Sequence, residues 1–99
     1  MTKKVAKRAV RIIEIPGDEF SKPEELQKFV QDAFSFPDYY GLNLDALYDC
    51  LSEISEKTKV VVSNSITEEE NLGVYGERFL SVLEEAAQDN EYLELKITE

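Results

Sequence analysis

Apolar residues at the start of the chain follow a strand pattern and then a helix pattern. β-branched residues dominate positions 10–15, and Pro16-Gly17 ends the run, which predicts a buried strand. Farther along, apolar residues recur every three or four positions, and this spacing predicts an amphipathic helix over residues 22–34. Ser21 and Glu24 form a capping-box pattern at its start.

A second helical pattern follows a short loop. Residues 38–42 are rich in tyrosine and glycine, and Asn43 after them suits the N-cap of a helix over residues 44–54. One apolar stripe runs along this predicted helix and consists of Leu44, Leu47, Leu51 and Ile54.

The second half of the chain repeats this alternation. The valines at 60–62 predict a second strand, and alternating apolar residues at 93–97 predict a last one. A capping-box pattern at 67–70, with Gly73 able to cap the far end, predicts a short helix. Apolar residues at helical spacing predict a longer helix over 77–88.

This order of elements favours parallel strand pairing, because each return to the same sheet edge needs a crossover of a dozen or more residues. We expect an α/β fold, a small single domain in which a three-stranded parallel sheet packs with about four helices. Its 99 residues suit one domain, and no repeat or linker divides them. The domain is expected over residues 9–99, after a flexible basic lead-in at 1–8.

The charge is strongly negative and unevenly distributed. The chain carries 11 Lys and Arg against 21 Asp and Glu, a net charge of −10, and five of the cations precede the first acid, Glu14. The remaining body repels nucleic acids and anionic lipid, since binding a polyanion requires cations. We therefore expect a basic protein partner, although many acidic proteins use their charge for solubility alone.

The polar side of the second predicted helix carries a row of acids. Asp45, Asp49 and Glu53 recur every four residues, opposite the leucine stripe, and Tyr48 borders the row. Like charges at this spacing destabilise a helix by a few tenths of a kcal/mol per pair. The row is either an ordinary solvated face or an anionic ridge that meets Arg and Lys of a partner.

Tyrosines near this row favour the second interpretation, because tyrosine is enriched in protein interfaces. Tyr39 and Tyr40 lie in the preceding loop, where one of them is expected to pack against the Phe34 end of the first helix. Glu85 and Asp89 form a further acidic pair on the later helix.

The composition does not favour an enzyme. The chain has no histidine and a single cysteine, Cys50, and it contains no GxSxG, GxxxxGK[ST] or GxGxxG motif. The carboxylates leave one alternative of another class open, a weak Ca²⁺ or Mg²⁺ site or part of a carboxylate hydrolase. Without a membrane-span pattern or signal peptide, we expect a cytoplasmic protein that has no catalytic residues and no cofactor.

Residues 37–51 read PDYYGLNLDALYDCL and closely resemble the signature segment of the barstar family, intracellular inhibitors of secreted guanyl-specific ribonucleases such as barnase. The family pattern is P-[DE]-Y-Y-G-x-N-L-D-A-L-x-D-C-L. The order of elements also agrees with the family from Val10 to Ile97. This chain departs from it at Tyr48 and Ile54, where the family has tryptophans.

The resemblance implies a 1:1 complex in which the loop and the second helix plug the active site of a basic ribonuclease. Helix carboxylates then occupy the place of RNA phosphates, with Asp49 central and Gly41 allowing close backbone approach. The implied partner-binding residues are Tyr39, Gly41, Asn43, Asp45, Tyr48, Asp49 and Glu85. An immunity protein against another toxin nuclease is the alternative within the same class.

Overall fold

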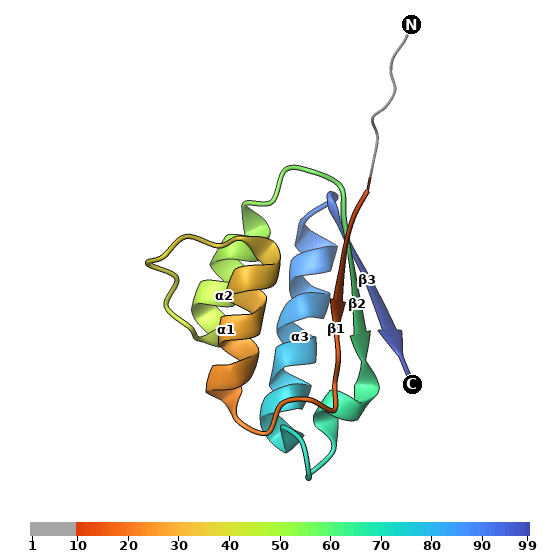
Figure 1. The fold of residues 1–99 in the computed structure, drawn as a ribbon. Helices are drawn as coiled ribbons and strands as arrows, with labels where there is room; N and C mark the ends of the chain where they lie inside the picture. Colours follow the sequence, from red (N-terminus) through yellow and green to blue (C-terminus); the bar gives the residue numbers. More distant parts are fainter. Residues whose placement is uncertain (1–9) are drawn as a thin grey trace, which may run out of the picture.

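One parallel sheet of three strands, in the spatial order β1-β2-β3, carries the fold (Figure 1). The computed structural model describes residues 10–99, so the predicted lead-in at 1–8 lies outside the described residues. The elements are β1 (Arg11–Ile15), α1 (Pro23–Phe34), α2 (Leu44–Ser52), β2 (Thr58–Ser63), the 3-10 helix η2 (Asn64–Thr67), α3 (Gly73–Asp89) and β3 (Leu93–Thr98).

The predicted α/β class and the parallel pairing are confirmed, and residues 10–99 contain three α-helices and one short 3-10 helix where about four helices were expected. Both crossovers join neighbouring strands, and right-handed crossovers in the same direction place their helices on the same face of a sheet. Figure 1 shows α1, α2 and α3 on one side of the sheet, with the other side open.

Each strand directs alternate residues toward the helices. Ile13 pairs with Val60 and Val60 with Leu95, which forms one apolar row on the covered face. The prediction that the first strand is buried is correct for this face only. Ile12 points to the open side and is 60% exposed, because no layer covers the sheet there.

The segment between β2 and α3 differs from its prediction. The expected short helix after Thr67 is absent from the described residues, and η2 lies before that position. Gly73 does not end a helix but begins α3, which is one turn longer at its start than predicted. The physical reason is close packing: a Cβ on Gly76 would lie 2.1 Å from the carbonyl oxygen of Ile66, so only glycine lets α3 start against η2.

The start of α1 also differs in detail. Lys22, not Ser21, is the N-cap, and no side chain caps the helix. The backbone N–H of Ser21 instead donates to Oε1 of Glu25 at 3.2 Å. The predicted capping box of Ser21 with Glu24 is therefore wrong: the helix begins one residue later, with Pro23 in the first helical position, and Glu25 takes the place of Glu24.

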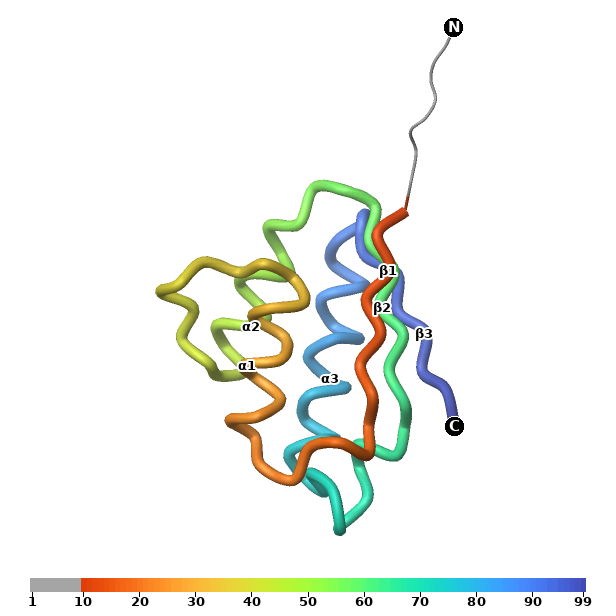
Figure 2. The backbone as a smooth tube through the Cα atoms, viewed as in Figure 1, coloured from red at the N-terminus to blue at the C-terminus, as the bar shows by residue number. Residues whose placement is uncertain are grey.

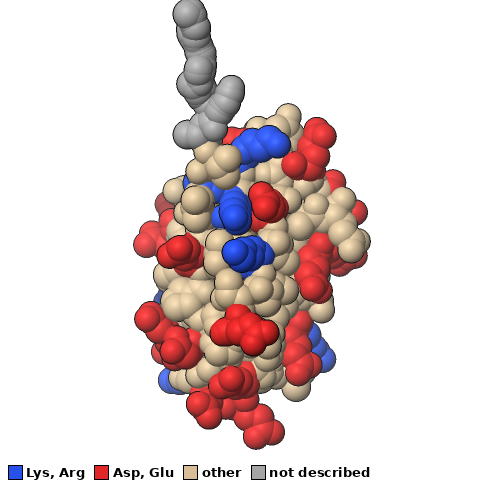
Figure 3. Space-filling view, turned by 90° about the vertical axis from the view of Figure 1, so that its right-hand side faces the viewer, with Lys and Arg blue, Asp and Glu red and all other residues tan. Residues whose placement is uncertain are grey.

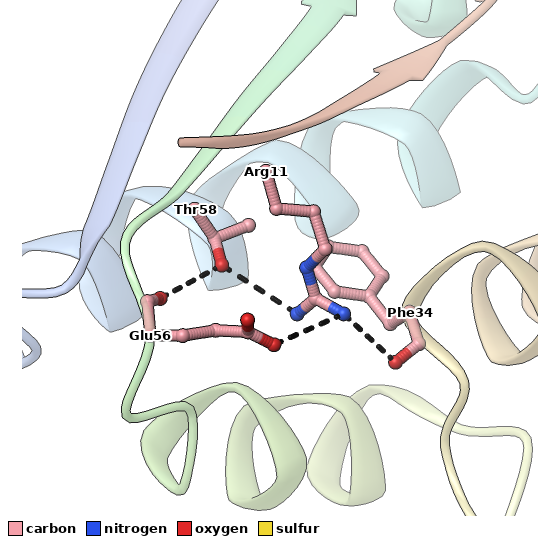
Figure 4. Close-up of polar contacts among 4 residues, drawn as sticks. All are labelled: Arg11, Phe34, Glu56 and Thr58. Atoms are coloured by element: carbon pink, nitrogen blue, oxygen red, sulfur yellow. Dashed lines mark hydrogen bonds and ion pairs between the residues drawn. The ribbon is translucent and has the colours of Figure 1, made fainter. Parts of the chain in front are cut away.

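Arg11 ties the sheet to the end of α1 (Figure 4). Its guanidinium donates to the Phe34 carbonyl and to Oγ1 of Thr58, both at 3.5 Å, and lies 5.8 Å from the centre of the Phe34 ring. Glu56 lies 3.7 Å from the same group. These contacts fix the point at which the chain leaves α1 for the loop.

α2 packs mainly on α3, on the side of α3 away from the sheet. Figure 2 shows the loop between α1 and α2, coloured yellow, projecting at the edge of the molecule farthest from the sheet. The fold therefore presents this loop and α2 to a partner. Among residues 10–99, no helix has both the length and the apolarity that crossing a bilayer requires.

Candidate functional site

α2 is held at both ends by asparagine side chains. Asn43 is the N-cap as predicted, and its Oδ1 accepts from the backbone N–H of Ala46 at 2.8 Å. At the other end Nδ2 of the buried Asn90 donates to the carbonyls of Leu51 and Ile54, at 2.9 and 3.0 Å. A helix of nine residues is marginal alone, so these caps fix its position.

The two faces of α2 differ as their spacing predicts. Leu47 and Leu51 have no exposed surface and anchor the helix in the core. Asp45, Asp49 and Glu53 are all exposed, with Glu53 as the C-cap residue. We call these three carboxylates the acidic ridge. Successive members lie one helical turn apart, at a rise of about 6 Å.

Among the described residues, no Lys or Arg forms an ion pair with the acidic ridge. Within residues 10–99 the single ion pair joins Arg11 to Glu56, off the ridge. Lys59 and Lys96 lie on the open face of the sheet, where Lys59 neighbours Glu94 in the register. Figure 3 views that face and shows a group of cations in its upper half, surrounded by acids. Lys59 and Lys96 thus lie on the open face of the sheet, away from the acidic ridge on α2.

The two loop tyrosines have opposite orientations. Tyr39 is 87% exposed, whereas Tyr40 is buried and packs on Phe36 with ring centres 5.0 Å apart. Phe36 in turn stacks on Phe34, which confirms that one tyrosine packs at the end of the first helix. Burial raises the pKa of the Tyr40 hydroxyl well above its usual value. Of these two tyrosines, Tyr39 is the one available to a partner.

An open pocket of about 280 Å³ lies between this loop and α2. Asp49 and Glu53 line one side, and aromatic residues of the loop line the other. The lining residues are Ser35, Phe36, Pro37, Tyr39, Tyr40, Gly41, Ala46, Asp49, Cys50 and Glu53. Two carboxylates facing aromatic rings suit a cationic side chain, which gains both an ion pair and a cation–π contact.

The carboxylates of this pocket affect the thiol of Cys50. Its thiol is half-buried, and burial together with the charges of Glu53 and Asp49 raises its pKa. The neutral thiol is therefore favoured, which opposes a nucleophilic role.

Tyr48 links α2 to α3. Its hydroxyl donates to Oδ2 of Asp89, and this hydrogen bond is the main cause that raises the pKa of Tyr48. The charge of Glu85 also raises it, so Glu85 lies near the same side of α2. Glu85 and Asp89 thus add negative charge beside the acidic ridge.

The pocket gathers three of the residues expected in the site, namely Tyr39, Gly41 and Asp49. The others lie outside the pocket: Asn43 caps the helix, Asp45 lies one turn from Asp49, and Tyr48 contacts Asp89 of α3, near Glu85. Glu53 was predicted as part of the acid row but not as a site residue. Its spacing of four from Asp49 was the available signal.

The positive φ angles of this loop fall on Ser35 and Leu42 and not on Gly41. A Cβ on Gly41 would lie 3.1 Å from Nδ2 of Asn43, so a side chain there would crowd the N-cap. Within the described residues, no group of three or more His, Cys, Asp or Glu side chains is arranged to hold a metal ion.

Comparison with known proteins finds a family match and a similar protein. The sequence model of the family described as Barstar (barnase inhibitor) matches residues 10–98. A protein of Bacillus subtilis (strain 168) named "Putative ribonuclease inhibitor YrdF" is 38% identical over 81 residues, which cover 81% of this chain and 89% of that protein. Both matches include the loop and α2.

Proposed function

The chain belongs to the barstar family, as residues 37–51 predicted, and from this premise we propose that it inhibits a small secreted guanyl-specific ribonuclease of the barnase type. The loop and α2 enter the basic active site of that enzyme in a 1:1 complex. The observation that carries the proposal is the acidic ridge, which is exposed and forms no ion pair among the described residues.

The chemistry of the acidic ridge is that of a phosphate mimic. Carboxylates one helical turn apart are separated by about 6 Å, which is similar to the distance between successive phosphates of a nucleic-acid strand. A ribonuclease active site holds cations for those phosphates, and carboxylates accept charge-assisted hydrogen bonds from guanidinium and ammonium groups. Asp45 and Asp49 therefore occupy phosphate positions.

The pocket beside Asp49 contributes specificity. A cationic or imidazolium side chain of the enzyme fits between the Asp49 and Glu53 carboxylates and the ring of Tyr39. Tyr39 is exposed, and a tyrosine ring offers a large contact area at a low cost in rotamer entropy. Besides Asp49, the expected partner contacts are Tyr39 and Gly41 in this pocket and Asn43, Asp45, Tyr48 and Glu85 outside it.

The overall charge promotes the encounter with a basic enzyme. Charges of opposite sign accelerate association, most strongly at low ionic strength. The cations on the open sheet face lie away from α2, so the field at the acidic ridge stays negative. The family description is that of an inhibitor, and we propose no catalytic activity, cofactor or metal for this chain.

The direct test is a titration of barnase with the purified chain in an RNA-cleavage assay. We expect cleavage to stop at one equivalent of the chain. Full activity of barnase and of other guanyl-specific ribonucleases with the chain in excess would contradict the proposal. Coexpression with toxin nucleases of other folds tests the immunity alternative, since only the cognate toxin is neutralised.

A further inference from the structure

Gln27 of α1 is a polar side chain that lies entirely inside the molecule, with 0% exposure. Its Oε1 accepts a hydrogen bond from the Tyr40 hydroxyl, and its Nε2 donates to the Tyr75 hydroxyl at 2.7 Å. Tyr40 belongs to the loop before α2, and Tyr75 belongs to the first turn of α3. One buried amide thus joins the loop, α1 and α3.

A carboxamide is well suited to this position. It offers an acceptor and a donor on one planar group, so it satisfies two hydroxyls at once. An apolar side chain would leave the Tyr40 hydroxyl buried without a partner, which is costly. The hydrogen bonds therefore specify where Tyr40 lies, beyond the contact that its ring makes with Phe36.

Tyr40 is at the same time part of the pocket that contains Asp49. Its backbone N–H donates to the Pro37 carbonyl at 2.9 Å, which closes the turn that directs Tyr39 outward. The position of the buried ring consequently determines the shape of the loop. Two side chains of α1 make polar contacts with this loop: Gln31 donates to the Pro37 carbonyl at 3.0 Å from the surface, and Gln27 is the buried one.

We propose that Gln27 is a positioning residue, whose amide fixes Tyr40 and thereby holds residues 37–43 in the shape that receives the partner. This inference rests on the proposed function of the loop and α2 as the binding surface. Gln27 itself is buried and touches no partner. It acts by reducing the ordering that the loop must undergo on binding.

The test compares Gln27→Met, which keeps length and volume but removes both hydrogen bonds, with a matched control. Val62→Ala removes buried volume from β2, away from the loop, and lowers stability without touching Tyr40. Two quantities are measured well below the unfolding temperature: the hydrogen-exchange protection of the Tyr40 amide and the affinity for barnase. A purely structural role for Gln27 predicts the same result for both variants.

We expect Gln27→Met to lower both the hydrogen-exchange protection of the Tyr40 amide and the affinity for barnase about tenfold. Val62→Ala should change neither quantity. If Gln27→Met does not fold, Tyr40→Phe removes the same hydrogen bond from the other side and is measured in its place. Protection equal to that of the control would overturn the inference.

Exchange and binding separate the two hypotheses. If the wild type inhibits barnase and Gln27→Met leaves the protection of the Tyr40 amide unchanged, the positioning role is refuted and the proposed function stays intact. Faster exchange in a chain that binds no ribonuclease refutes the proposed function, whereas the exchange result still supports the control of the loop by Gln27.

Discussion

Replacement of Asp49 by asparagine is expected to change stability and binding in opposite directions. Asp49 is exposed and lies one turn from Asp45 and from Glu53. Each like-charge pair at this spacing costs a few tenths of a kcal/mol, so Asp49→Asn should stabilise the free protein by about 0.5 kcal/mol. For a domain of this size that gain raises Tm by roughly 2–4 °C.

The same change should strongly weaken the affinity for the ribonuclease. Asparagine keeps the shape of the pocket but leaves the cations of the enzyme buried without a counter-charge, at a cost of about 3–5 kcal/mol. The dissociation constant then rises by roughly 150-fold to 4000-fold. The assay is inhibitory titration against the ribonuclease that the wild type inhibits, together with urea unfolding of the free chain.

The matched control is Glu14→Gln, which removes the same charge from the open face of the sheet. It should leave the dissociation constant within about threefold, because its effect on the encounter is long-range and screened. An Asp49→Asn variant that binds as tightly as Glu14→Gln refutes the phosphate-mimic interpretation. A loss of stability above about 1 kcal/mol would instead indicate an intramolecular role for Asp49.

Three further outcomes follow from the same structure. The association rate with the ribonuclease should fall about tenfold or more between low salt and 1 M salt, with little change in dissociation, in stopped-flow mixing; a rate independent of salt contradicts electrostatic steering. The rate of Cys50 alkylation by iodoacetamide should increase at a higher pH in the native protein than in urea, because folding raises the pKa of the thiol. Glu53→Gln should move this pH profile of the native protein to lower pH, since the charge of Glu53 contributes to the raised pKa. Native and urea profiles that coincide would refute this prediction. Gly76→Ala should lower the free energy of unfolding in urea by about 3 kcal/mol, because the added Cβ meets the backbone of Ile66; a neutral result would show that α3 shifts freely against η2.

Most elements of the fold were predictable because their apolar periodicity reflects burial directly. The predicted helices at 22–34 and 44–54 agree with α1 and α2 within two residues at each end, and each strand agrees within two residues. The error at 64–76 has a different origin. A capping-box pattern is a local signal, whereas the start of α3 is set by the contact of Gly76 with η2, which the sequence does not reveal.

The candidate site was predictable to the extent that it lies on a helix. Spacing alone places the acidic ridge opposite the leucines, and the structure agrees. Loop residues have no such period, so which of Tyr39 and Tyr40 faces outward could not be predicted. The decisive partner, Gln27, lies 13 residues away, and Asn90 reaches α2 from 36 to 39 residues away. Contacts of this range follow from the tertiary fold.

The local sequence of α2 works against its own stability, and this conflict is itself informative. The helix has nine residues, its acids repel one another, and Glu53 lies at the negative end of the helix dipole. Burial of Leu47 and Leu51 contributes about 1.5–3 kcal/mol each and outweighs those penalties. A solvated face could equally carry lysines, which would remove the repulsion. Because no described Lys or Arg forms an ion pair with the acidic ridge, the repulsion is best relieved by cations of a partner. Substitutions that neutralise the acidic ridge should therefore stabilise the free chain while weakening its complex.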